Sequence, residues 1–425
     1  MKVLVIGGGG REHALVSRLA AEVDPLDLWV TPGNPGTARL ARTALAPLDR
    51  PDALVELADR ERIELTIVGP ELPLSVGVAD VFARAGRLLV GPSQAAARLE
   101  TSKAFAKAFM HRHGVPTARF RSCTSADQAL ATARSAELGY PLVLKADGLA
   151  AGKGVVIAGD RQEAEMAIHD AMIAKRFGAS GASLVLEECL TGPEVSFFVI
   201  CDGTRAVPIG TAQDHKRIFN DDRGPNTGGM GAFAPSPLVD APLADLVMRR
   251  IVDPVLRGMA AEGCPYRGFL YVGLMLTATG PQVIEFNVRL GDPEAQVILS
   301  LIGEPLLPLL VGAARGNLPD APVRLEPQVR VGVVIASRGY PESSESDQPI
   351  TGVEAAEHLD GVSVFHAGTA HRAGQLVTAG GRVLTVVGHG RDYTTAIARA
   401  YAAVERISFD GMQYRRDIGK KAISA

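Results

Sequence analysis

The sequence predicts a multidomain chain of the α/β and α+β classes, with a doubly wound parallel sheet at its N-terminus. Three observations predict this. The first 100 residues alternate apolar β-type runs with helical patterns. A glycine-rich loop lies between two β-type runs near residue 150, and past residue 327 a β run precedes a helical pattern typical of a small α+β domain. The predicted domain limits are 1–100, 101–326 and 327–425.

The N-terminal segment should form four main strands, each ending in turn-forming residues. The predicted strands are KVLVI, LDLWV, LTIVG and LLVG, with helices at about 12–21 and 51–60 and another before the last strand. Ligands of such sheets bind outside the carboxyl ends of the strands. The turns 7–11, 31–36, 69–71 and 91–93 are therefore candidate substrate loops.

The first turn, GGGGR, does not fit a dinucleotide-binding fingerprint. The pattern GxGxxG that begins at Gly7 and Gly9 would need a glycine where Glu12 stands. The run LDLWVTPGN also lacks the acidic residue expected to contact a ribose after the second strand. A nicotinamide or flavin site is therefore disfavoured. The alternative is a purely structural role, in which these glycines only permit a tight turn.

The central segment is predicted to open with a helix and continue into a hairpin flap. Ser102 is a candidate N-cap and Gly114 a candidate helix end. In Pro141–Ile157, β-type runs bracket four residues whose backbone amides or ammonium group could cover polyphosphate oxygens: Gly148, Gly152, Lys153 and Gly154. A Walker loop is excluded because glycine, rather than Ser or Thr, follows Lys153. The flap subdomain should span about 115–188 and a catalytic subdomain about 189–326.

The run VIEFNVR predicts a strand with one polar face. Ile284, Phe286 and Val288 alternate with Glu285, Asn287 and Arg289, so the first set should be buried and the second presented together. A carboxylate and a carboxamide oxygen two residues apart suit a hard ion such as Mg²⁺. The alternative is an exposed strand face, although the adjoining RLGDPEAQ adds two more acids.

Residues 213–235 combine charges, glycines and prolines in a stretch predicted to hold no regular element. Long loops inside compact domains are usually functional or disordered. Phe219, Met230 and Phe233 would give this one apolar anchors, so it should be ordered, at least with ligand bound. His215 is a candidate proton carrier, but a lone histidine is more often a hydrogen-bonding support.

Composition excludes several classes of protein. The formal net charge is -3 and the pI about 6.3, which gives no basic surface for nucleic acid. The four cysteines are far apart and form no CxxC, which argues against zinc and a disulfide framework. No export or membrane segment is apparent. We expect a cytoplasmic protein with small-molecule substrates and no nucleic-acid or membrane partner.

Six motifs together carry a resemblance that covers the whole chain. They are GGREHA at 9–14, LKADGLAAGKGV at 144–155, QDHKR at 213–217, GPNTGGMGA at 224–232, EFNVRLGDPEAQ at 285–296 and RRDIG at 415–419. In these motifs and their order the chain resembles the glycinamide ribonucleotide synthetases. The resemblance implies a central ATP-grasp pair of domains. It also implies ATP-dependent ligation of glycine to 5-phosphoribosylamine through glycyl phosphate, in the second step of purine synthesis.

The resemblance also implies site residues. Lys103 and Lys145 would contact ATP phosphates beneath the flap at 148–154, Glu187, Glu188 and Leu190 would contact adenine, and Glu194 would hold the ribose. Glu285 and Asn287 would hold Mg²⁺ or Mn²⁺, although no acid stands on the preceding run FLYVGLML. Lys145, Asp214 and Arg289 are the predicted catalytic residues. The predicted substrate contacts are Gly9, Gly10, Arg11, Glu12, His13, Pro70, Glu71, Asp214, Asn226, Thr227, Gly228, Gly229, Arg289, Gly291 and Asp292.

Three departures from the family pattern stand out. The chain has Leu290 where phenylalanine is usual, Gly8 where Asn or Ser is common, and FNDD at 219–222 where FDGD is common. The last change should alter a turn.

Two rival functions remain: another ATP-grasp ligase or carboxylase acting on a purine intermediate, and a metabolite sensor that kept the ATP pocket. The GPNTGGMGA loop disfavours the first rival, and retention of Lys145, Glu285 and Asn287 disfavours the second. The chain is expected to be a monomer.

Overall fold

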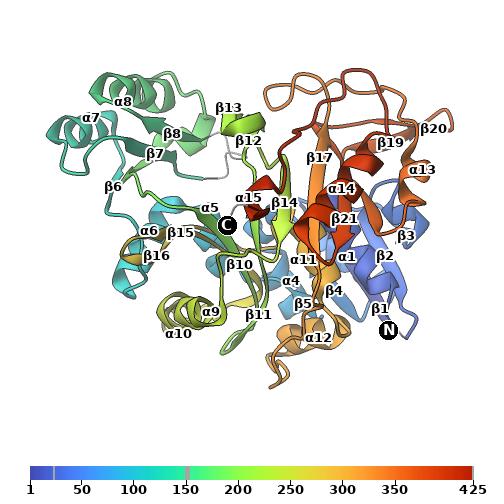
Figure 1. Ribbon diagram of the computed structural model, residues 1–425. Helices are drawn as coiled ribbons and strands as arrows, with labels where there is room; N and C mark the ends of the chain where they lie inside the picture. The colour runs from blue at the N-terminus through green and yellow to red at the C-terminus, as the bar shows by residue number, and fades with distance from the viewer. Residues whose placement is uncertain (23, 149–153, 424–425) are drawn as a thin grey trace.

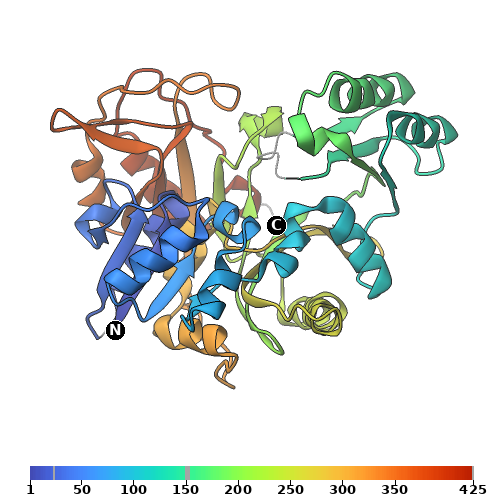
Figure 2. The ribbon, with the colours of Figure 1, turned by 180° about the vertical axis from the view of Figure 1, so that it is seen from behind.

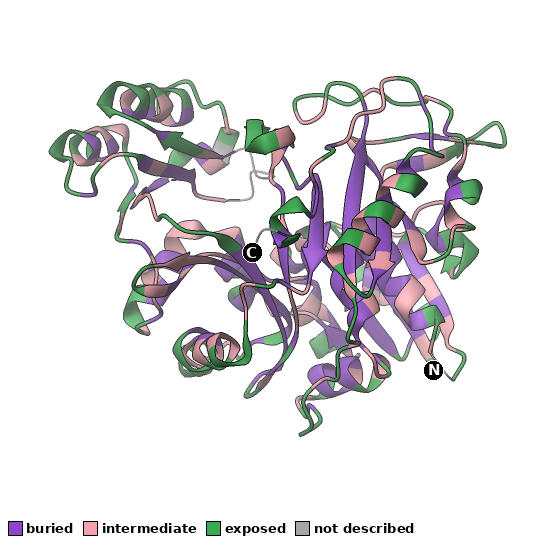
Figure 3. Cartoon of the chain, in the orientation of Figure 1, coloured by how far each residue is buried: buried purple, intermediate pink, exposed green. Residues whose placement is uncertain are grey.

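The computed structural model describes residues 1–22, 24–148 and 154–423 (Figure 1). Three main sheets organise these residues: a five-stranded N-terminal sheet, an eight-stranded sheet and a four-stranded sheet. The four-stranded sheet and its helices form a lobe at one end of the molecule, and the C-terminal segment lies at the other end (Figures 1 and 2). Buried residues follow the strands, whereas the outer faces of the helices are exposed (Figure 3).

The N-terminal sheet confirms the predicted doubly wound parallel arrangement. Its strand order is β3-β2-β1-β4-β5, and every pairing is parallel. The strands are β1 (Lys2–Gly7), β2 (Asp27–Pro32), β3 (Arg42–Thr43), β4 (Leu65–Val68) and β5 (Leu89–Val90). The helices are α1 (Gly10–Ala20), α2 (Pro51–Arg60), α3 (Glu71–Ser75), α4 (Val78–Arg84) and α5 (Gln94–Thr101). The run Val3–Ile6 is fully buried because helices cover both faces of the sheet. This order brings the turns after β1 and β4 side by side.

The eight-stranded antiparallel sheet runs from the centre of the chain into the C-terminal segment. Its order is β16-β15-β10-β11-β14-β17-β21-β18, so it continues without a break past residue 327. The strands are β10 (Glu194–Asp202), β11 (Ala206–Asp214), β14 (Gly231–Ala234), β15 (Arg267–Thr277), β16 (Gly280–Asn287), β17 (Val329–Ala336), β18 (Val362–His366) and β21 (Arg382–Gly390). The site residues of the central segment and those of the C-terminal segment therefore share one rigid support.

Several helices and one β-hairpin flank this sheet. Helices α9 (Ala241–Val247), α10 (Asp253–Ala261), α11 (Glu294–Ile298) and α12 (Leu307–Arg315) belong to the central segment. The C-terminal segment adds α13 (Val353–Glu357), α14 (Tyr393–Val404), α15 (Lys420–Ile423) and the hairpin of β19 (Thr369–Arg372) and β20 (Gln375–Thr378). The buried alanines of α14 pack on β17 and β21, which confirms the predicted α+β character of this segment.

The flap lobe contains the four-stranded sheet and the two helices that cover it. Strands β6 (Phe120–Cys123), β9 (Leu184–Glu188), β7 (Leu142–Ala146) and β8 (Val155–Ala158) are adjacent in that order, with α7 (Ala126–Ser135) and α8 (Arg161–Ile168) packed on them. β7 and β8 pair antiparallel, as the predicted hairpin requires. Gly152 and Lys153 lie outside the described residues.

Helix α6 (Lys103–Arg112) leads into this lobe and begins and ends as the sequence predicts. The Ser102 hydroxyl accepts a hydrogen bond from the Phe105 amide at 3.1 Å, which caps the helix N-terminus. Gly114 follows the helix with φ +66°, a conformation that glycine adopts without steric cost. The helix thereby presents Lys103 at its first turn.

The prediction that residues 213–235 hold no regular element is wrong. They contain the end of β11, the short strands β12 (Arg217–Phe219) and β13 (Arg223–Asn226), and β14. β14 pairs with β11 and with β17, and this tertiary pairing overrides the low strand propensity of a glycine-rich sequence. Met230 and Phe233 are buried as expected, but Phe219 is 56% exposed and is not the buried anchor that was predicted.

Candidate functional site

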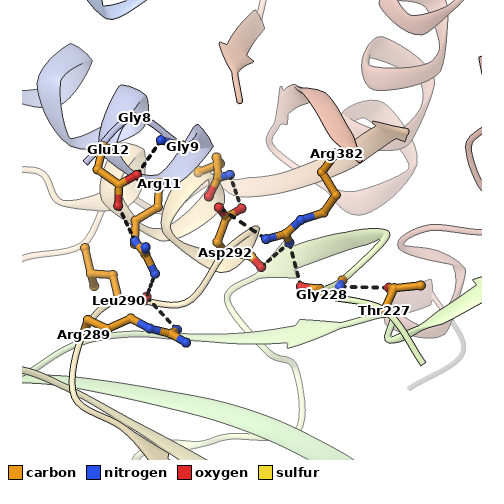
Figure 4. Close-up of polar contacts among 12 residues, drawn as sticks. Gly8, Gly9, Arg11, Glu12, Thr227, Gly228, Arg289, Leu290, Asp292 and Arg382 are labelled. Atoms are coloured by element: carbon orange, nitrogen blue, oxygen red, sulfur yellow. Dashed lines mark hydrogen bonds and ion pairs between the residues drawn. The ribbon is translucent and has the colours of Figure 1, made fainter. Parts of the chain in front are cut away.

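The turn after β1 is built around the carboxylate of Glu12. Glu12 accepts hydrogen bonds from the Gly9 amide and from Arg11 Nε, both at 2.6 Å (Figure 4). A Cβ added at Gly7 or Gly69 would lie 2.4 or 2.1 Å from this side chain, so both positions need glycine. These glycines therefore let Glu12 lie flat between two strand ends and fix the start of α1.

Arg11 joins this turn to the segment that follows β16. Its Nη1 donates to the Leu290 carbonyl at 3.0 Å (Figure 4). The neighbouring Arg289 forms ion pairs with Glu100 at 2.7 Å and with Glu71 at 3.2 Å. Burial raises the pKa of Glu100, although Arg289 opposes this shift. The two arginines thus hold the N-terminal turns and the RLGDPE segment together.

A cavity of about 380 Å³ lies where three parts of the chain meet. Its lining comes from the turns after β1 and β2, from Asp292 and from the C-terminal segment: Gly8, Gly9, Gly33, Asn34, Asp292, Ala367, Gly368, Thr369, Ala379 and Arg382. Arg382 Nη1 donates to the carbonyls of Gly228 at 2.6 Å and Asp292 at 2.5 Å (Figure 4). Its Nη2 lies 3.5 Å from the Asp292 carboxylate. One guanidinium of the C-terminal segment therefore joins two predicted substrate segments, 226–229 and 291–292.

The predicted phosphate-binding lysines contact β16 and the first residue of the flap. Lys145 Nζ donates to the Ile284 carbonyl at 3.0 Å, and Lys103 Nζ donates to the Gly148 carbonyl at 2.9 Å. The register between β15 and β16 shifts at Ile284, which is a β-bulge. Ile284 is therefore only partly buried, contrary to the predicted alternation, whereas Phe286 and Val288 are buried as expected.

Glu187 lies beneath these lysines. It is 3% exposed, and one carboxylate oxygen is 2.9 Å from Lys107 Nζ and 3.1 Å from Lys145 Nζ. The other oxygen has no hydrogen-bond partner among the described residues. Burial lowers the pKa of Lys107 to about 8, although Glu187 opposes the shift. The predicted hinge carboxylate is thus turned inward toward lysines, whereas the next residue, Glu188, pairs with Arg119 at 2.7 Å near the surface.

A third group of charges surrounds Lys216. Lys216 Nζ pairs with Glu194 at 2.8 Å and lies 3.7 Å from Asp214. Burial raises the pKa of Asp214. Burial, followed by the charge of Asp214, raises the pKa of Glu294 to about 7. Glu194, the predicted ribose ligand, is therefore already paired with Lys216, and burial raises the pKa of two neighbouring acids, Asp214 and Glu294.

The donor set of β16 fits a hard divalent ion. Glu285 and Asn287 lie opposite Gly273 and Tyr271 of β15, and both side chains are partly exposed. In residues 1–22, 24–148 and 154–423, no group of three or more His, Cys, Asp or Glu side chains is arranged to hold a metal. Two oxygen donors from the protein, with the rest from water and phosphates, is the pattern usual for Mg²⁺.

Two of the predicted residues are buried histidines. His13 is buried, and its Nδ1 accepts a hydrogen bond from the His366 amide at 2.8 Å. It lines a separate cavity of about 620 Å³ that holds few of the motif residues. His215 is buried, and neither ring nitrogen has a hydrogen-bond partner among the described residues, so the expected supporting role is not seen. Burial lowers its pKa to about 4, and the ring is neutral at pH 7.

The site also includes residues that the sequence did not single out. They are Glu100, Lys107, Lys216, Glu294 and Arg382. Lys107 carried a signal, since it lies four residues after Lys103 on the same face of α6. Lys216 and Glu294 stood inside the motifs at 213–217 and 285–296, although neither was given a role. Glu100 and Arg382 join the site through ion pairs between distant segments.

Family models cover most of the chain in three parts. The N domain, the ATP-grasp (A) domain and the C domain of phosphoribosylglycinamide synthetase match residues 1–100, 101–295 and 330–421. The phosphoribosylamine–glycine ligase of Vibrio cholerae is 48% identical over 100% of this chain and 99% of its own length. The corresponding ligase of Ralstonia nicotianae is 47% identical over the full length of both chains.

Solved structures agree with this relationship. The crystal structure of phosphoribosylamine–glycine ligase from Thermotoga maritima superposes with a TM-score of 0.86 at 34% identity, over 98% of this chain and 100% of that one. A biotin carboxylase from Campylobacter jejuni shares the fold, with a TM-score of 0.74 at 16% identity over 99% of this chain and 93% of that one. Within the described residues, no helix has the length and apolar content needed to span a membrane. The chain belongs to the phosphoribosylglycinamide synthetase family and is an ATP-dependent ligase with an ATP-grasp domain.

Proposed function

We propose that this protein joins glycine to 5-phosphoribosylamine and converts ATP to ADP and phosphate, with glycinamide ribonucleotide as the product. One observation carries the proposal beyond the family relationship. Residues 284–292 contact Lys145 through the Ile284 carbonyl, Arg11 through the Leu290 carbonyl and Arg382 through Asp292. This single stretch of chain supports the proposal, because it links a predicted nucleotide-binding lysine to residues beside the cavity near Arg382.

The chemistry follows from what each reactant lacks. A glycine carboxylate does not react with an amine, so its oxygen first attacks the γ-phosphorus of ATP, and ADP leaves. The product of that step is glycyl phosphate. The amine of phosphoribosylamine then attacks the glycyl carbonyl, and phosphate leaves. Positioning and exclusion of water by the closed flap contribute more to this second step than one strong base.

The lysines supply charge at the transferring phosphoryl group. Lys103 and Lys145 emerge from α6 and β7 beside the hairpin flap. Their ammonium groups offset the negative charge that spreads over the phosphoryl oxygens. Glu285 and Asn287 would hold Mg²⁺ or Mn²⁺, which when bound supplies further positive charge at the same oxygens. Glu194, which is paired with Lys216, would contact the ribose.

The cavity near Arg382 suits a sugar phosphate. Arg382 provides a planar cation, and Gly9, which caps the N-terminus of α1, also lines the cavity. Asp292 provides an anion that suits ribose hydroxyls or an amine rather than a phosphate. A ligand with a phosphate at one end and hydroxyls and an amine at the other, such as phosphoribosylamine, matches both charges.

We expect Arg382→Ala to raise the KM for phosphoribosylamine by about 10-fold or more, because a hydrogen bond to a charged group contributes about 1.5–3 kcal/mol. The KM for ATP should stay the same. Steady-state kinetics with each substrate varied in turn measures both values. Arg372→Ala, which removes an exposed arginine from the neighbouring β19–β20 hairpin, is the matched control. An equal rise in both KM values for Arg382→Ala would contradict a sugar-phosphate contact.

The proposed reaction predicts that phosphate release from ATP requires glycine and phosphoribosylamine together. The measurement is a phosphate assay with each substrate omitted in turn, followed by mass detection of the ribonucleotide product. Release that ignores either substrate would contradict the proposed ligation. Bicarbonate in place of glycine is the control, since carboxylases share this fold at low identity. The cytoplasmic location and the monomeric state remain predictions.

A further inference from the structure

The RRDIG motif at 415–419 had no predicted role, and the structure places it against one hairpin. The tail, defined as residues 415–421, lies beside the β12–β13 hairpin, defined as residues 217–226. Arg415 is 1% exposed. Its Nη1 donates to the Arg217 carbonyl at 3.0 Å and to the Asp222 carboxylate at 2.9 Å. A fully buried arginine is thus committed to contacts with this hairpin.

Other tail residues bind the same turn of the hairpin. Asp417 accepts a hydrogen bond from the Asp221 amide at 2.9 Å, and it also pairs with Arg415 at 2.6 Å. The Arg416 amide donates to Asn220 Oδ1 at 2.9 Å, and Lys421 Nζ pairs with Asp222 at 2.6 Å. Burial tends to raise the pKa of Asp417, but hydrogen bonds from Arg415 outweigh it and the pKa falls to about 2. The network is therefore charged at pH 7.

The turn that the tail holds has an unfavourable backbone. Asp221 and Asp222 have φ angles of +59° and +51°, in the left-handed region where a Cβ is crowded. The family pattern commonly has glycine at position 221. Such conformations persist where surrounding contacts fix them. Here the contacts come from Asp417, Arg415 and Lys421. The tail therefore offsets the conformational cost of placing two aspartates in the left-handed region at this turn.

The base of the hairpin carries charges of the site. Thr227 closes it, because its amide and its hydroxyl both donate to the Lys216 carbonyl, at 2.7 and 2.8 Å. Lys216 in turn pairs with Glu194, the predicted ribose ligand. On the other strand, the segment 226–229 leads to the carbonyl that Arg382 contacts. The hairpin lies between the flap lobe and the C-terminal helices (Figures 1 and 2).

We propose that the tail is a latch that positions the β12–β13 hairpin, and that Arg415 thereby sets nucleotide affinity without contacting the nucleotide. When the latch is released, the turn at 220–222 relaxes and the hairpin moves. Lys216 then no longer holds Glu194 in place, and the nucleotide site loses its alignment. The link to nucleotide affinity rests on the proposed ATP-dependent function, whereas the mechanical latch does not.

Limited proteolysis of the full chain tests the latch directly. We expect trypsin to cleave after Arg217 and Arg223 at least about 10-fold faster in Arg415→Ala than in the parent protein, because cleavage follows the population of the open hairpin. Arg416→Ala is the matched control, since its side chain lies over the Tyr414 ring rather than on the hairpin. Mass spectrometry identifies the cleaved bonds. Equal cleavage in the two variants would overturn the proposal.

Titration with a non-hydrolysable ATP analogue tests the consequence for the site. Arg415→Ala should weaken binding by about 10-fold, which corresponds to about 1.4 kcal/mol. Arg415→Lys should restore part of the affinity, and Arg416→Ala should bind normally. Normal affinity in Arg415→Ala with a released hairpin would overturn the positioning role. If Arg415→Ala fails to fold, Asp222→Asn, at a partly exposed carboxylate, must show both effects in weaker form. Failure of the proposed reaction would leave the proteolysis result intact.

Discussion

Replacing Glu285 by alanine should lower turnover by at least about 100-fold, the scale expected for loss of an electrostatic catalytic group. Two effects add. The change removes one of the two oxygen donors that β16 offers to a divalent ion. It also removes an anion close to Lys103, whose pKa is already lowered by burial and is partly restored by Glu285. Both changes alter the charges that face the transferring phosphoryl group.

Binding and turnover should separate this role from a structural one. Electron paramagnetic resonance with Mn²⁺ and an ATP analogue should report weaker metal binding in Glu285→Ala. Glu285→Gln keeps the size of the side chain and should lose most of the same activity. Gln282→Ala, on the same strand, is the control and should turn over close to normally. Near-normal turnover of Glu285→Ala would refute the metal role.

Local sequence patterns predicted the parts of the fold that local patterns control. The parallel N-terminal sheet follows from apolar runs separated by turn residues, and α6 follows from its N-cap and its terminal glycine. Glu285 and Asn287 were predicted to share one face because a strand puts residues two apart on the same side, and both are partly exposed on β16. The bulge at Ile284 was missed because it depends on pairing with β15. The carbonyl of Ile284 accepts the hydrogen bond from Lys145.

The remaining errors have a common cause. The strands in residues 213–235 are glycine-rich, and β14 exists because β11 and β17 lie on either side of it. Arg382 and Glu100 lie far from the motifs in sequence and have no local pattern that marks them. They enter the site through ion pairs with Asp292 and Arg289. Long-range ion pairs of this kind cannot be predicted from the spacing of residues in one chain.

Glu187→Gln should destabilise the flap lobe by about 3–5 kcal/mol, the usual loss when one partner of a buried ion pair is removed. The carboxylate lies between Lys107 and Lys145, at 2.9 and 3.1 Å, and nearly all of it is buried. Without it two ammonium groups would face each other away from water. The midpoint of the first urea-induced transition at pH 7 measures the loss.

The pH dependence of that loss has a definite sign. Burial lowers the pKa of Lys107 to about 8, below its ordinary 10.5. Between these values the unfolded chain binds more protons than the folded one, so this group makes stability rise with pH. In Glu187→Gln the folded pKa should fall further. The pH-dependent rise in stability should then begin at lower pH in this variant. Its loss of unfolding free energy relative to the parent protein should therefore shrink as pH increases.

Glu188→Gln is the matched control for this prediction, because it removes the same charge one residue away. Glu188 pairs with Arg119 at 2.7 Å, but water reaches both side chains. Exposed pairs contribute about 0–1 kcal/mol, so this variant should unfold close to the parent protein at every pH. Equal losses in the two variants would mean that burial of Glu187 between lysines does not determine its contribution, and that the lysines find other counter-charges when it is gone.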